Sequence, residues 1–141
     1  MKGILDRMLL QHNPDALLAI SESGEILHWN DAAEVIFGYS CDEALGRLLI
    51  DLIVPSDRRD EERRMQEDAV RQGLAVYESV RRRKDGLLLH VSVTTTAIRD
   101  ARGDVECFLA TKKDITHLKA LRDAKLVESK FGDLLYLRTD G

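Results

Sequence analysis

Apolar and polar positions recur with a period of two in some segments and with helical spacing in others, which predicts a mixed fold. Two apolar runs, 17–20 and 26–29, flank the turn dipeptide Ser23-Gly24, a pattern typical of a β-hairpin. Asn30 stands where a helix N-cap is expected, and Gly38 stands where a left-handed C-cap would end that helix. This part of the chain therefore predicts two strands followed by a helix.

Two further helices are expected before the next strand. Ser40 and Glu43 have the spacing of a capping box and open a short helix that ends at Gly46. A longer helix is predicted from Pro55-Ser-Asp57 to about Gln72, with Gly73 ending it.

Charge dominates this longer helix, so we expect most of its surface to be solvated. Opposite charges stand four residues apart in the pairs Arg58 with Glu62, Asp60 with Arg64, Arg63 with Glu67 and Arg64 with Asp68. The apolar residues left to face inward form a narrow stripe of Met65, Ala69 and Val70.

Three segments rich in β-branched residues, 76–83, 87–98 and 105–111, predict three more strands. The turns Lys84-Asp85-Gly86 and Asp100-Ala-Arg-Gly103 separate them. The predicted fold class is α+β, a five-stranded antiparallel sheet with helices inserted between strands 2 and 3. Helical spacing of apolar residues predicts flanking helices at both ends of the chain.

In combination, these elements resemble a PAS domain. The resemblance rests on the stretch from Gly24 to Arg47, the Lys84-Asp85-Gly86 turn, the strand around Val91-Ser-Val93 and the motif Asp114-Ile-Thr116. It covers roughly residues 14–116, and it implies the PAS fold and a sensory and interaction role in signal transduction. We expect an N-terminal amphipathic helix at 1–13, the PAS domain at 14–116, and a C-terminal signalling helix or linker at 117–141 that also looks like the start of a following domain.

Strand alternation indicates which side chains face the concave side of the sheet. Leu89, Val91 and Val93 share one face of their strand and should point inward, whereas His90 should point to the outer face, where partners dock. Similarity to ligand-holding PAS domains places residues of the neighbouring strands on the same inner face. The candidate pocket-lining residues are Tyr77, Ser79, Leu89, Val91, Val93, Phe108, Ala110 and Lys112. Ordinary core packing is the alternative for all of them.

The sequence lacks the residues that the best-known PAS cofactors require. The resemblance to photosensory LOV domains implies a cysteine shortly after Gly46-Arg47, but Leu48-Leu-Ile50 follows, and the position of the flavin-contacting glutamine holds Lys112. We therefore do not expect flavin-thiol photochemistry. Haem-binding PAS domains imply a histidine on the long helix, which has none, with Glu61 near that position. His28 and His90 remain conceivable ligands, so a haem gas or redox sensor is a minor alternative, and the cofactor is left unknown.

Charge, hydrophobicity and cysteine content limit the partners and the cellular compartment that the sequence predicts. The net charge of −4 is small, and the acidic and basic residues are interspersed. The run Arg81-Arg-Arg-Lys84 precedes a turn, so we interpret it as a solvated turn and expect no nucleic-acid partner. No segment is long and apolar enough to span a bilayer, and Cys41 and Cys107 lack metal or CxxC spacing, so we expect a cytoplasmic protein without membrane contact by this segment. The sequence has no Gly-rich phosphate loop, no grouping typical of an activated nucleophile and no metal-ligand spacing, so we do not expect this chain to be an enzyme. A catalytic output such as a histidine kinase or cyclase would lie outside this chain.

The C-terminal helix is where we expect the signal to leave. Thr116 can cap it, and its apolar positions alternate by four and three, as in a coiled coil. The resemblance implies a hinge at Asp114 and Thr116 that leads to an output domain, as in two-component kinases. We expect a homodimer, with a possible small-molecule ligand; a ligand-free docking module is the main alternative. The candidate dimer seam comprises Leu5, Met8, Ala120, Ala124, Val127, Phe131 and Leu134.

Overall fold

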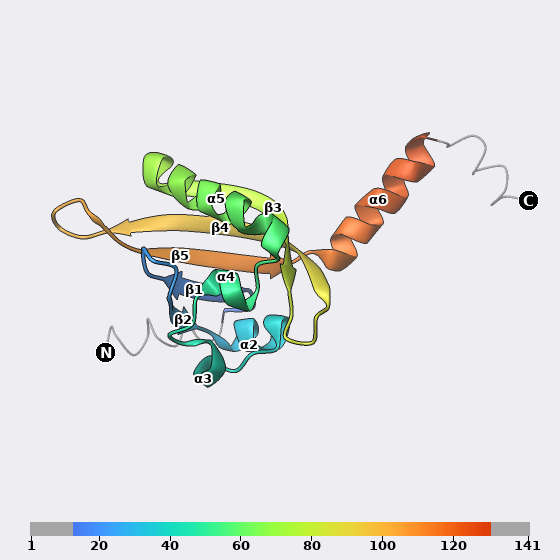
Figure 1. Cartoon of the computed structure of the whole chain (residues 1–141). Helices are drawn as coiled ribbons and strands as arrows, with labels where there is room; N and C mark the ends of the chain where they lie inside the picture. The colour runs from blue at the N-terminus through green and yellow to red at the C-terminus, as the bar shows by residue number, and fades with distance from the viewer. Residues whose placement is uncertain (1–12, 131–141) are drawn as a thin grey trace, which may run out of the picture.

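A five-stranded antiparallel sheet in the order β2-β1-β5-β4-β3 forms the centre of the fold (Figure 1). The computed structural model describes residues 13–130, with side chains described to residue 125. The strands are β1 (Ala16–Ile20), β2 (Ile26–Trp29), β3 (Leu74–Arg82), β4 (Leu88–Arg99) and β5 (Val105–Asp114). The helices are α2 (Asp31–Phe37), α3 (Cys41–Ala44), α4 (Leu49–Leu52), the 3-10 turn η1 (Ser56–Arg58), α5 (Arg59–Gln72) and α6 (Thr116–Lys130). The predicted fold class is confirmed.

Asn30 fastens the first helix to the sheet. Its side-chain oxygen accepts hydrogen bonds from the amide of Ala33, as the predicted N-cap should, and also from the amide of Leu17 in β1, both at 2.9 Å. Its amide nitrogen donates to the carbonyl of Asp15 at 3.0 Å. Because Asn30 is fully buried, these bonds satisfy backbone groups that water cannot reach.

One face of the sheet carries the core. Leu18 and Ile20 of β1, Val91 and Val93 of β4 and Phe108 of β5 alternate with more exposed residues and are buried. The helices cover this face, with Trp29 stacked at a tilt against Phe37 at 5.6 Å between ring centroids. The helix α5 runs alongside β3 and β4 (Figure 1). Two-residue periodicity therefore identifies the inner face correctly.

The helix α5 differs from the sequence expectation on its inner side. Glu62 is buried at 3% exposure, whereas Val70, expected in the inner stripe, is exposed at 36%. The expected pairing four residues apart is also wrong for Arg58, which pairs with Glu61 at 3.1 Å. Arg63 likewise pairs with Asp60 at 3.5 Å, three residues away. Arg58 does not pair with Glu62 because Glu62 faces the sheet and binds Arg81 of β3.

The last described helix, α6, extends away from the sheet (Figure 1). Its first turn contacts β4, and its further length projects beyond the sheet edge. No helix in the described part of the chain is long and apolar enough to cross a membrane. The expected N-terminal helix at 1–13 and the end of the expected seam, Phe131 and Leu134, lie outside the described residues; Asn13 alone of the first range is described. The short helix α4 was not expected.

Candidate functional site: a charged interior and the sheet-to-helix junction

A buried ion pair occupies the concave side of the sheet. Arg81 at the end of β3 donates from Nη2 to Oε2 of Glu62 on α5 at 2.7 Å, and the two side chains are 0% and 4% exposed. The hydroxyl of Tyr77 donates to the same Glu62 oxygen at 2.8 Å. The pairing of an inward arginine with an inward glutamate ties α5 to the edge strand β3.

Three polar side chains extend this network toward the surface. Arg81 Nη1 donates to the hydroxyl of Ser79 at 2.9 Å, and Ser79 in turn donates to the carboxylate of Glu61. Gln66 donates to Oε1 of Glu62 at 3.4 Å. Both carboxylates of α5 that approach the sheet are therefore committed to hydrogen bonds with named partners.

Lys112 of β5 brings a second cation into the same interior. Its side chain is 0% exposed, and among the described residues its ammonium nitrogen has no hydrogen-bond partner. Register pairs Lys112 with Val93 of β4, and Val93 with Tyr77 of β3, so Lys112 stands on the same inner face as the Glu62 network.

Burial and charge act on the pKa of each group in this interior. Burial lowers the pKa of Lys112, and Arg81 lowers it further against the attraction of Glu62, leaving it at about 8. Burial alone would raise the pKa of Glu62, but Lys112, Arg81 and the hydrogen bonds from Tyr77 and Gln66 hold it below its usual value. Burial and the nearby Glu62 raise the pKa of Tyr77 above its usual value. Near pH 7 the carboxylate of Glu62 therefore stays ionised, and the phenol of Tyr77 stays neutral.

Two cavities adjoin this network. One, of about 330 Å³, lies between α5, α4 and the turn joining β1 to β2. Its wall comprises Glu22, Ser23, Gly24, Ile50, Arg59, Glu62, Arg63 and Gln66. Glu62 belongs both to this wall and to the buried ion pair, whereas Arg81 and Lys112 line neither cavity.

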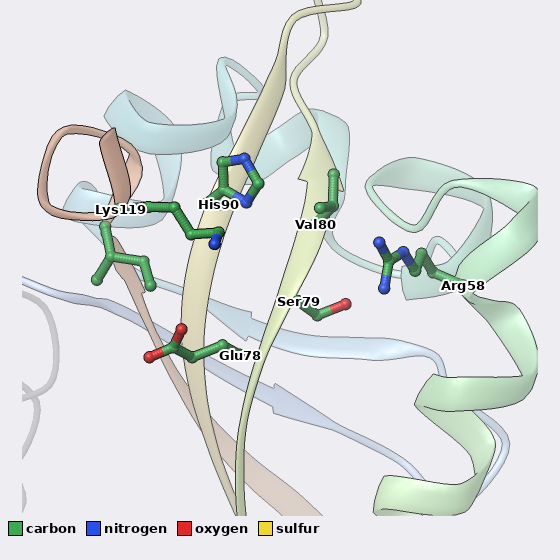
Figure 2. Close-up of a pocket in the computed structure, with 7 residues that line it drawn as sticks. Arg58, Glu78, Ser79, Val80, His90 and Lys119 are labelled. Atoms are coloured by element: carbon green, nitrogen blue, oxygen red, sulfur yellow. The ribbon is translucent and has the colours of Figure 1, made fainter. Parts of the chain in front are cut away.

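The other cavity, of about 280 Å³, is a cleft around the edge strand β3, next to the start of α6 (Figure 2). Figure 2 shows Glu78, His90 and Lys119 on one side of it, and Ser79 pointing toward Arg58 on the other. Its lining residues are Arg58, Glu78, Ser79, Val80, His90, Ile115 and Lys119. Ser79 therefore takes part in the interior network and also borders this outer cleft.

The predicted pocket-lining residues gather on the concave face, but as a packed interior. Five of the eight are buried apolar residues of β4 and β5: Leu89, Val91, Val93, Phe108 and Ala110. The other three, Tyr77, Ser79 and Lys112, surround the Glu62 network. Of the eight, only Ser79 lines either of the two cavities. That these residues hold a ligand stays a prediction.

The junction between β5 and α6 is held by side-chain hydrogen bonds. The Thr116 hydroxyl donates to Asp114 Oδ1 at 2.7 Å and accepts from the backbone amide of His90 at 3.1 Å. Asp114 Oδ1 also accepts from the amide of Thr116 at 3.0 Å. The expectation that Thr116 caps α6 is wrong in this detail: Ile115 provides the first helical carbonyl, to Lys119, and the Thr116 side chain turns to β4 instead.

The interior offers no cysteine to hold a flavin and no histidine to hold a haem among the described residues. Cys41 stands at the start of α3 and Cys107 on β5; both are partly exposed, and burial raises the pKa of each thiol. His90 lines the outer cleft rather than the concave side (Figure 2). His28 lies on β2 opposite Ala19, off the inner face, and burial lowers its pKa. Among the described residues, no group of three or more metal-ligating side chains could hold an ion.

Sequence reasoning missed both partners of the buried ion pair. The run Arg81-Arg-Arg-Lys84 was expected to be a solvated turn, but Arg81 is fully buried, because it continues the inward alternation of Tyr77 and Ser79 along β3. That two-residue spacing is the signal that could have identified it. Glu62 carries no comparable signal, since it lies within a helix whose neighbours are nearly all charged.

A five-stranded antiparallel sheet with helices inserted after its second strand, and a helix leaving its last strand, defines an α+β domain class. The model of the PAS fold matches residues 5–115, and the chain belongs to the PAS family, a family of sensory and interaction modules of signalling proteins. The C-terminal end of this match at Ile115 falls where β5 passes into α6.

Comparisons with individual proteins agree on the fold. The PAS domain of a protein from Colwellia psychrerythraea superposes with a TM-score of 0.77 at 23% identity, covering 83% of this chain and 99% of that one. An RNA-binding Light-Oxygen-Voltage receptor superposes with a TM-score of 0.76 at 22% identity, covering 92% of this chain and 37% of that one. An uncharacterized protein of Azorhizobium caulinodans is 35% identical over 57 residues, 40% of this chain. The match spans only 8% of that protein's length.

Proposed function

We propose that this chain is the sensory and interaction module of a signalling protein, and that it passes a change in its interior through Asp114 and Thr116 to α6. The observation that carries the proposal is the position of the Thr116 hydroxyl. It joins the strand end at Asp114 to the backbone of His90 on β4. A shift of β4 against β5 therefore alters the first turn of α6.

Two further contacts attach α6 to the sheet. The amide of Ile115 donates to the carbonyl of His90 at 2.8 Å. Arg122, two turns into α6, donates from both terminal nitrogens to the carboxylate of Glu78 on β3, at 3.1 and 3.2 Å. The helix is thus held by β4 at its start and by β3 further along, so its direction depends on how these strands lie.

The interior network reaches the same strand. Ser79, which accepts from Arg81 and donates to Glu61, is the chain neighbour of Glu78. Because the side chains of adjacent strand residues point to opposite faces, a shift of Ser79 with the interior moves Glu78 on the outer face. These contacts link the interior to α6 through β3 and β4. They support the proposal that a ligand shifts the positions of these two strands.

The mechanism is a population shift between two arrangements of α6 relative to the sheet. A ligand or partner can favour one arrangement only by as much as its binding free energy differs between the two. The output domain lies beyond α6, and any catalytic activity belongs to it. We place the protein in the cytoplasm because neither Cys41 nor Cys107 has the spacing of a disulfide framework or a metal site.

The test is the pair of substitutions Asp114→Ala and Thr116→Ala, made together. In the parent protein they should abolish the response of the output to its stimulus, while the far-ultraviolet circular dichroism of the domain stays unchanged. Within the chain alone, spin labels at Val76 and Lys125, in a background lacking both cysteines, should give a narrow distance distribution that the double variant broadens.

Asp100→Ala is a matched control for this experiment. Asp100 Oδ1 accepts the amides of Arg102 and Asp104 in the turn between β4 and β5, at the other end of β5 from Asp114. Its loss should leave both the output response and the distance distribution unchanged. A normal response in the Asp114 and Thr116 double variant would overturn the proposal.

The second candidate is a ligand-free module that only dimerises or docks. Leu118 and Leu121 on α6 are 50% and 54% exposed, and Val76 on β3 is 63% exposed, so apolar surface is free for a partner. Native mass spectrometry against the denatured mass separates the two candidates. A bound small molecule supports sensing, whereas a dimer without one supports docking.

A further inference from the structure

The outer cleft lies apart from the concave interior, at a point where four segments of the chain meet. Arg58 of η1, His90 of β4, Lys119 of α6 and residues 78–80 of β3 all line its volume of about 280 Å³ (Figure 2). Because these residues are far apart in sequence, the shape of the cleft depends on how α6 sits against the sheet.

The amide of Val80 is a hydrogen-bond donor that faces away from the sheet. Arg83 donates its amide to Leu87 across the hairpin, whereas Arg82 donates its amide to the carbonyl of Ile53, off the sheet, at 2.7 Å. Successive amides of a strand point in opposite directions, so Val80 also directs its amide away from β4. Within the described residues this amide has no acceptor. A molecule in the cleft can therefore accept a hydrogen bond from the edge of β3.

Three side chains that line the cleft are also able to donate. The ring of His90 makes no hydrogen bond to any described residue. Lys119 pairs with Asp123 at 3.3 Å and Arg58 pairs with Glu61 at 3.1 Å, and both pairs are partly exposed to water. Exposed pairs between neighbours on one helical segment contribute little, so either cation can exchange its partner for a better acceptor.

The carboxylate that lines the cleft is already compensated. Glu78 accepts from both terminal nitrogens of Arg122, at 3.1 and 3.2 Å. The permanent charges of the lining that remain are those of the two cations, Arg58 and Lys119. The lining therefore favours an anion over a cation.

We propose that the outer cleft binds a small phosphate monoester, whose terminal oxygens accept hydrogen bonds from Arg58, His90, Lys119 and the amide of Val80. A phosphate group carries about −1.5 to −2 charges at pH 7 and three strong acceptor oxygens, so it can accept from donors that approach from several directions. A carboxylate offers two oxygens in one plane. The volume lies at the small end of ligand sites, which leaves room for the phosphate and a short organic group.

Such a ligand joins η1, β3 and β4 to α6. It therefore stabilises the arrangement in which α6 lies against the sheet, because only in that arrangement do all four donors reach it. The site goes beyond the proposed function, since it lies outside the concave interior and acts directly on α6.

The experiment is a calorimetric titration of the full chain with glycerol 3-phosphate and with succinate, at pH 7 in about 0.1 M sodium chloride. Glycerol 3-phosphate should bind at one site, and succinate at least about tenfold more weakly. Lys119→Met should weaken binding of the phosphate ester at least about tenfold. Lys125→Met, exposed further along α6 and outside the cleft, is the matched control and should bind like the wild type.

A second pair of variants tests the other wall of the cleft. Arg58→Gln should weaken binding of glycerol 3-phosphate in the same way as Lys119→Met. Arg71→Gln removes an arginine that also pairs three residues away, with Asp68, but that lies outside the cleft. It should bind like the wild type.

Nuclear magnetic resonance locates the site without a substitution. On addition of glycerol 3-phosphate, the amide of Val80 and the ring of His90 should show the largest chemical-shift changes. Four results would overturn the assignment: no binding of glycerol 3-phosphate, equal binding by Lys119→Met and the wild type, succinate binding as tightly, or the largest changes at Arg59 and Arg63 of the other cavity.

Binding at the cleft and signalling through the hinge are tested separately. If glycerol 3-phosphate binds but the Asp114 and Thr116 double variant responds normally, the cleft site stands without the hinge. If glycerol 3-phosphate does not bind and the double variant loses its response, the hinge stands without the cleft site.

Discussion

Glu62 and Arg81 lie 19 residues apart in the chain and form a buried ion pair of 2.7 Å that closes α5 onto the edge strand. Removing one partner of a buried pair leaves the other charge without compensation, and this typically costs about 3–5 kcal/mol. Here the loss of Glu62 leaves two cations, Arg81 and Lys112. The pair therefore determines where α5 sits.

We expect Glu62→Gln to lower the free energy of unfolding by about 3 kcal/mol, measured by urea denaturation at pH 7. Glu67→Gln, on the exposed side of the same helix, should change it by less than about 0.5 kcal/mol. The wild type should also lose stability as the pH falls, because the folded-state pKa of Glu62 is held low. This contribution is present above the unfolded value near pH 4.5 and is lost as the pH falls through the folded pKa. Equal costs at positions 62 and 67 would contradict the burial argument.

Lys112 should give the stability a second rise with pH, in the alkaline range. Its pKa is about 8 in the folded chain and 10.5 for the free side chain, so the unfolded state binds more protons between these values and stability rises with pH there. The full shift corresponds to about 3 kcal/mol. Below pH 8 the cost of the buried charge is fully present.

Lys112→Met should therefore raise the free energy of unfolding by about 2 kcal/mol at pH 7, and its advantage should shrink as the pH rises to about 9.5. Measurements stop there, because Tyr77 has a raised folded pKa and its ionisation in the unfolded chain near pH 10 begins to favour unfolding. Lys113→Met should show no such pH dependence. A difference between wild type and Lys112→Met that stays constant from pH 7 to 9.5 would rule out a depressed pKa for Lys112.

Asn30 and Ser40 offer a comparison between a buried and an exposed helix cap. Asn30→Ala leaves the buried amides of Leu17 and Ala33 without an acceptor, which should cost about 2–4 kcal/mol by urea denaturation. Ser40→Ala removes an exposed capping box with Glu43 and should cost about 1 kcal/mol. Similar costs for the two variants would show that the bond from Leu17 adds little.

Local patterns predict much of this fold because each signal acts over a few residues. The cap at Asn30, the left-handed Gly38 and Gly73, and the alternation of Val91 and Val93 all depend on neighbours in sequence. The site depends on longer separations. Glu62 and Arg81 are paired only because α5 folds across β3. The alternation along β3 marks Arg81 as inward, but nothing near Glu62 marks it as buried.

The junction shows the same limit on a smaller scale. The motif Asp114-Ile-Thr116 marks the place where β5 ends, but the bond from the His90 amide to Thr116 spans 26 residues. That contact requires β4 and β5 to pair in their actual register, with Val91 opposite Asp114. Sequence spacing therefore placed Asp114 and Thr116 at the end of β5 but gave the wrong role, a helix cap, to Thr116.

Two substitutions can test whether the chain dimerises through the predicted seam on α6 or through the exposed leucine face of the same helix. Ala120 and Ala124 lie on the predicted seam and are exposed, whereas Leu118, half exposed, lies on the far side of the same helix by heptad spacing. We expect the chain to be a dimer by sedimentation equilibrium and Ala124→Glu to raise its dissociation constant at least tenfold, because a charge enters the apolar seam. Leu118→Glu should leave the dimer intact. If Leu118→Glu dissociates it while Ala124→Glu does not, the exposed leucine face mediates the association and the predicted seam is wrong.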